Sequence, residues 1–134
     1  MTTGDAQEWL AHAAADLHYA RLGQKDADAL ENLIVFHAQQ AIEKALKAVM
    51  VERGVEFPKT HDLEQLVEII EEAGVAWPPD MNKVLEFTPF ATQGRNPGFG
   101  DPISEADVEE AIEMAGKVLA WAHQEVAKAS GAGS

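Results

Sequence analysis

Apolar residues recur between residues 27 and 52 with the spacing of a wide helical face. Two neighbouring stripes are formed by Leu30, Leu33, Ile34, His37, Ala41, Ile42, Ala45, Leu46, Ala48 and Val49. Because residues three and four apart share one side of a helix, this pattern predicts a helix covered by at least two others. Gly54 and Pro58 mark its end. No segment shows the period-two alternation that is typical of strands.

Further helical patterns lie on both sides of this segment. We predict helices over 5–22, 60–73 and 104–129 and a short helical segment over 80–87. Asp5 and Glu8 have the spacing of an N-terminal capping pair. Ser104 and Asp107 have the same spacing and predict the start of the last helix.

Glycine and proline mark the connections. Gly23 and Gly74 are expected to end the first and third helices. Residues 88–102, rich in both, are expected to form the longest loop. We therefore predict one all-α domain, an up-and-down helical bundle of four main helices plus a short helix. Its helical core is expected over 5–129, with a frayed tail over 130–134.

The chain is strongly acidic. Its 134 residues include 23 Asp and Glu against 10 Lys and Arg, which gives a net charge of −13. A field of this sign repels phosphate backbones and anionic membranes, so nucleic-acid binding requires a local basic patch. The lack of cysteine excludes disulfides and Cys-ligated zinc and is consistent with a reducing cytoplasm, where we expect the protein. We expect no cofactor, and the absence of a membrane-length apolar run predicts no membrane contact.

Basic side chains gather in one part of the sequence. Lys44 and Lys47 are one turn apart, and Lys59 and His61 stand where the next helix begins. The free N–H groups of a helix N-terminus attract anions. We therefore predict a nucleotide- or phosphate-binding site at these four residues together with Arg95 of the long loop. The alternative is that the lysines are solvated and paired with glutamates, a contribution of only ~0.3–0.5 kcal/mol per pair.

His37 lies within the apolar stripe of the second helix. We interpret it as a hydrogen-bonded core residue rather than a catalyst. Gln39 and Gln40 are expected at the flank of the stripe, where their amides can hold hydrogen-bonding partners.

Two lines of polar residues have a four-residue spacing. They are Glu8, His12 and Asp16 in the first helix, and Glu105, Glu109 and Glu113 in the last. Three ligands along one straight helix converge poorly on a single ion, so we expect no metal site in the first line but a solvated face with a salt-bridged histidine. The second line repels itself, which suggests a solvated face or a docking surface for a basic partner.

Several short segments together resemble the HEPN family (higher eukaryotes and prokaryotes nucleotide-binding domain). They are Trp9 with 15–17 and 20–21, 38–41 with 43–48, 59–63 with Leu66, and Arg95-Asn96-Pro97 before the final Ala-rich helix. The resemblance runs from Trp9 to about Glu125. It implies a helical bundle that commonly forms homodimers and is often encoded beside a minimal nucleotidyltransferase, as a toxin–antitoxin-like pair.

Other members of the family are metal-independent ribonucleases with an Arg, often followed by a polar residue, and then a His four to six positions further on. In this chain Arg95 and Asn96 resemble the start of that motif, but Gly100, Asp101 and Pro102 occupy the positions of the His. A ribonuclease would therefore have to use a non-standard His, of which His61 is the best candidate.

The leading hypothesis is a non-catalytic HEPN-type module that binds a nucleotide or a partner protein, most plausibly a small nucleotidyltransferase. One alternative is a metal-independent ribonuclease that uses Arg95, Asn96 and His61. The other is a purely structural interaction protein that uses the Glu105–Glu113 face.

Overall fold

The computed structural model describes residues 5–26, 28, 31–60, 62–87 and 104–131, and the side chains of these residues except 86–87 and 129–131. Its elements are α1 (Ala6–Gln24), α2 (Glu31–Glu52), α3 (Leu63–Glu72), the 3-10 helix η1 (Pro79–Phe87) and α5 (Glu105–Gly131). This confirms the predicted all-α bundle of four main helices and one short helix.

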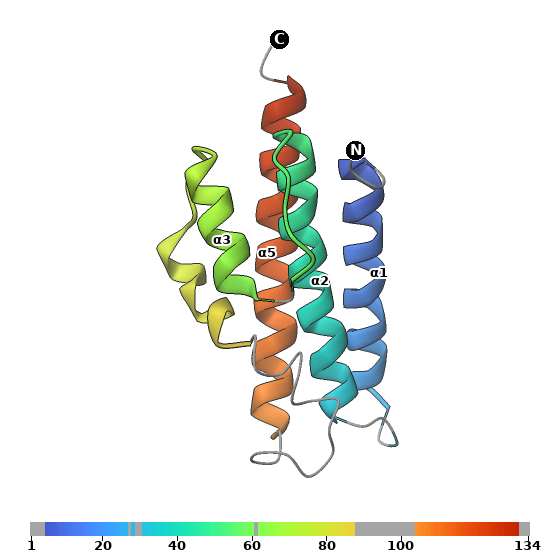
Figure 1. Cartoon of the computed structure of the whole chain (residues 1–134). Helices are drawn as coiled ribbons and strands as arrows, with labels where there is room; N and C mark the ends of the chain where they lie inside the picture. Colours follow the sequence, from blue (N-terminus) through green and yellow to red (C-terminus); the bar gives the residue numbers. More distant parts are fainter. Residues whose placement is uncertain (1–4, 27, 29–30, 61, 88–103, 132–134) are drawn as a thin grey trace.

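The long helices lie side by side along a common axis (Figure 1). α1 runs antiparallel to α2 and packs along its length, and α5 contacts both of them. The segment after α2 returns along that helix before α3 begins (Figure 1). α3 packs on α2, and η1 closes the side of the bundle against α3 and α5.

α2 is the central helix, as its wide apolar face predicts. Ala38, Ala41, Ala45 and Ala48 are fully buried in it. Their small side chains let neighbouring helices approach closely, while larger α2 side chains such as Leu46 fill the space between them. The helix therefore contacts α1, α3 and α5 at once.

Capping side chains start three of the helices, and those at α1 and α5 were predicted. The Asp5 side chain accepts a 2.8 Å hydrogen bond from the Glu8 amide at the start of α1. At α5, Ser104 Oγ accepts from the Asp107 amide at 3.1 Å, and Asp107 Oδ2 accepts from the Ser104 amide at 3.0 Å. This reciprocal pair confirms the predicted capping box. Asp62 caps α3, which therefore begins at Leu63 rather than at residue 60.

Two predicted helix ends were wrong. Gly23 lies inside α1, which ends at Gln24 because the Lys25 and Asp26 amides bond back to the carbonyls of Leu22 and Gly23 without a left-handed residue. α5 continues to Gly131, so the frayed tail does not begin at 130. Residues 132–134 and the loop 88–102 lie outside the described residues.

Gly74 ends α3 as predicted, with a φ of 89°. A Cβ there would meet no atom within 4 Å, so only backbone strain opposes substitution. We expect Gly74→Ala to lower the free energy of unfolding by ~1–2 kcal/mol, the cost of a left-handed conformation in a non-glycine residue. Urea unfolding followed by circular dichroism measures this change.

Gly116→Ala is the matched control for Gly74→Ala. Gly116 lies inside α5, and its Cβ would stand 3.4 Å from the flexible end of Arg21. Alanine should therefore raise stability there by ~0.5–1 kcal/mol. A loss at Gly116 equal to that at Gly74 would contradict the conformational explanation.

Candidate functional site

A cluster of three polar side chains joins α1 to α2. Asp16 of α1 lies opposite His37 and Lys44 because the two helices are antiparallel. Lys44 Nζ donates to Asp16 Oδ2 at 2.6 Å, and His37 Nδ1 lies 3.1 Å from Asp16 Oδ1. The Asp16 side chain is only 12% exposed, so both of its oxygens use partners within the chain.

The cluster fixes the His37 ring. An ionised carboxylate only accepts hydrogen bonds, so Nδ1 carries the proton in this contact. The His37 side chain remains 40% exposed, and its ring centroid lies 5.9 Å from that of Tyr19. His37 is therefore hydrogen-bonded, as expected, but it lies at the surface of the α1–α2 pair rather than in the core.

A second ion pair is buried further along α2. Lys47 Nζ donates to Glu43 Oε2 at 3.0 Å, and both side chains are nearly inaccessible to solvent. The same ammonium lies 5.8 Å from the ring centroid of Trp9 and 5.6 Å from that of Phe57. Lys47 thus connects α1, α2 and the segment before α3 through charge pairing and cation–π contacts.

The structure shows where three of the five predicted phosphate-binding residues lie. Lys44 and Lys47 are held by Asp16 and Glu43, whereas Lys59 is exposed and forms no ion pair with a described residue. The Lys44–Asp16 and Lys47–Glu43 ion pairs differ from the weak surface pairs that we expected as the alternative, because the carboxylates of Asp16 and Glu43 are buried.

The other two, His61 and Arg95, lie outside the described residues, and so does Asn96, which the ribonuclease alternative uses. At the N-terminus of α3, the Asp62 carboxylate already accepts from the amides of Glu64 and Gln65. It therefore places a negative charge where the bound phosphate was predicted. The five-residue site stays a prediction.

The line of polar residues in α1 is divided between two environments. Glu8 and His12 are exposed, whereas Asp16 is buried against α2. The expected solvated face is therefore wrong for Asp16, whose histidine partner is His37 instead of His12. Asp16 lies beside the buried Ala13, Leu17 and Ala20, and this spacing could have indicated from the sequence that Asp16 is buried. Its partners could not be identified in the same way, because they depend on how α1 is aligned along α2.

Gln39 and Gln40, which were expected to hold partners through their amides, bond to each other. Gln40 Nε2 donates to Gln39 Oε1 at 3.3 Å. Gln39 is fully buried, and its Nε2 has no hydrogen-bond partner among the described residues.

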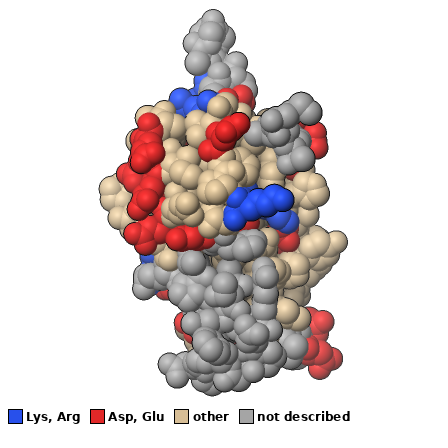
Figure 2. All heavy atoms as spheres, viewed as in Figure 1, with Lys and Arg blue, Asp and Glu red and all other residues tan. Residues whose placement is uncertain are grey.

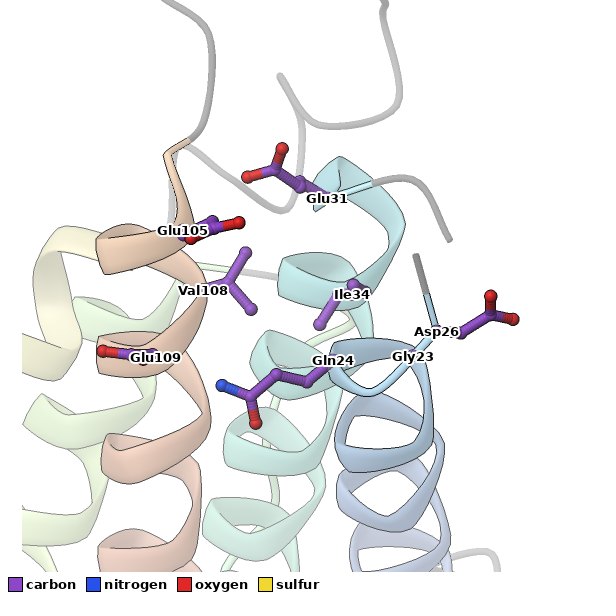
Figure 3. A pocket seen from close by; sticks show the side chains of 8 residues that line it. All are labelled: Gly23, Gln24, Asp26, Glu31, Ile34, Glu105, Val108 and Glu109. Atoms are coloured by element: carbon purple, nitrogen blue, oxygen red, sulfur yellow. The ribbon is translucent and has the colours of Figure 1, made fainter. Parts of the chain in front are cut away.

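A pocket of about 290 Å³ lies at the end of the bundle where α1 ends and α2 and α5 begin (Figure 3). Ile34 and Val108 face each other across it, and its lining includes Glu31, Glu105 and Glu109. The pocket disfavours a phosphate, because its carboxylates repel anions. Glu105 and Glu109, two residues of the predicted acidic line, thus border one cavity.

Acidic side chains also follow the side of the molecule that α3 and η1 form (Figure 2).

None of the helices in the described ranges has the length and apolarity needed to cross a bilayer.

The fold and these contacts define a small helical-bundle protein in which Asp16 of α1 joins that helix to His37 and Lys44 of α2. The family model for the HEPN domain matches residues 6–126, so the chain belongs to the HEPN domain family. No curated protein matches it.

Two solved structures share the fold. The crystal structure of TT1696 from Thermus thermophilus is 27% identical, with a TM-score of 0.79 over 90% of this chain and 97% of that chain. The crystal structure of ST0689, described as an archaeal HEPN homologue, is 25% identical, with a TM-score of 0.72 over 92% and 99% of the two chains.

Proposed function

We propose that this chain is the non-catalytic member of a toxin–antitoxin-like pair, a cytoplasmic homodimer that binds a small nucleotidyltransferase. Membership of the HEPN family supports the general class. The observation that carries the proposal is the placement of the α2 lysines. Lys44 and Lys47 neutralise Asp16 and Glu43 within the chain, so this segment builds the bundle instead of presenting free charge to a phosphate.

The chain also lacks the histidine expected of a family ribonuclease. Metal-free RNA cleavage requires a base for the 2′-hydroxyl proton and a group that stabilises the phosphate charge. Arg95 suits the second role, but Gly100, Asp101 and Pro102 stand where the family motif has its base.

Nucleotide binding is a second candidate, favoured by Lys59, which is exposed and forms no ion pair with another residue that the structure describes. Isothermal calorimetry with ATP, on the wild type and Lys59→Ala, tests this candidate. Binding weakened by the substitution supports a phosphate contact at Lys59, and the absence of heat with either protein removes the candidate.

Co-expression tests the pairing. The tagged chain is produced together with a small nucleotidyltransferase from the same genome, and the affinity-purified complex is sized by light scattering. We expect a stoichiometric complex. The proposal is overturned by the absence of a complex, or by metal-free RNA cleavage that Arg95→Ala abolishes, since cleavage would establish the ribonuclease alternative.

A further inference from the structure

The large apolar side chains that are most exposed in the described part of the chain lie on two adjacent helices. Tyr19 and Leu22 of α1 are 59% and 50% exposed, and Leu33 of α2 is 47% exposed. The Tyr19 ring lies 5.9 Å from that of His37, Leu22 is one turn from Tyr19, and Leu33 is one turn from His37. These four residues therefore form one continuous surface, which we name the α1/α2 face.

The α1/α2 face lies on helical segments that carry few carboxylates. Residues 9–24 and 32–47 contain only two carboxylates, Asp16 and Glu43, in a chain that has 23 acidic residues. Both are buried and paired with lysine. Two copies of a chain with net charge −13 repel each other when acidic surfaces meet. At the α1/α2 face this repulsion is small, because the nearby carboxylates of Asp16 and Glu43 are already paired with lysines of the same copy.

We infer that the α1/α2 face binds the same face of a second copy of this chain. This inference rests on the homodimer in the proposed function and assigns its contact surface. In a two-fold dimer the same surface of both copies forms the interface, so Tyr19, Leu22 and Leu33 become buried in each of the two copies. The Asp16–His37–Lys44 cluster then lies within the interface with its carboxylate already satisfied.

Arginine substitutions test the assignment without adding negative charge. Leu22→Arg and Leu33→Arg each place a cation on the face, and Ala120→Arg places the same cation at an exposed position of α5. All three lower the net negative charge equally, so general repulsion cannot explain a difference between them. Sedimentation equilibrium gives the dissociation constant, and circular dichroism confirms folding.

We expect Leu22→Arg and Leu33→Arg to raise the dimer dissociation constant at least ~30-fold, the effect of losing an interface hot spot, and Ala120→Arg to leave it unchanged. A monomeric wild type overturns both this inference and the proposed homodimer. A dimer that persists in both face variants overturns only the assignment of the surface. A dimer that persists while Leu33→Arg abolishes nucleotidyltransferase binding shows that the face belongs to the other protein.

A second measurement guards against variants that fail to fold. The natural chain has no cysteine, so Leu33→Cys and Ala120→Cys each carry one reactive thiol. If the face is buried in the dimer, maleimide labelling of Leu33→Cys slows as protein concentration rises, while labelling of Ala120→Cys does not. Equal rates at all concentrations would contradict the inference.

Discussion

Replacing Glu43 with alanine is expected to lower the free energy of unfolding by ~3–5 kcal/mol, the usual effect of removing one partner of a buried ion pair. Lys47 would then keep its charge at a site where its side chain is only 11% exposed. The Trp9 and Phe57 rings that lie near its ammonium offset only part of that cost. Urea unfolding followed by circular dichroism measures the loss.

A double substitution separates the charge effect from packing. Lys47→Met keeps a long side chain between Trp9 and Phe57 but removes the charge, so Glu43→Leu with Lys47→Met should recover most of the stability. If Glu43→Ala alone costs less than about 1 kcal/mol, then the ammonium of Lys47 reaches water and the ion pair does not stabilise the bundle.

Leu46→Ala is expected to cost ~2–5 kcal/mol, the range for a buried leucine that leaves a cavity. Leu46 is fully buried in α2, the helix that contacts α1, α3 and α5. Those helices already meet across alanines, so they cannot move closer to fill the space. The change in denaturant midpoint, at an unchanged slope, gives the loss.

Leu22→Ala provides the control for Leu46→Ala. Leu22 is half exposed, so its truncation should change stability by less than about 0.5 kcal/mol when the protein is dilute enough to be monomeric. Equal losses at the two positions would contradict the central role of α2.

The helices were predictable because their signals are local. The apolar spacing of α2, the capping pairs at Asp5 and Ser104 and the stop at Gly74 depend on residues within one or two turns. Gly23 misled the prediction because glycine permits a left-handed turn without requiring one. The backbone of α1 instead ends through amides that bond back to carbonyls three residues earlier.

The candidate site was predictable only in part. The sequence drew attention to Lys44, Lys47, His37 and Asp16, but it assigned them to a phosphate site, a core histidine and a solvated face. The contacts that Asp16 makes with His37 and Lys44 join residues that are 21 and 28 positions apart in the sequence. Such pairs depend on the register between α1 and α2, which no local pattern encodes.

The sequence by itself therefore determined where the helices form and which faces they bury, because hydrophobic spacing and capping act over a few residues. Only the tertiary structure decided that Asp16 of α1 pairs with His37 and Lys44 of α2, and that Tyr19, Leu22 and Leu33 share one uncovered surface. The physical reason is distance: charge pairing and surface continuity depend on which residues of separate helices meet in space.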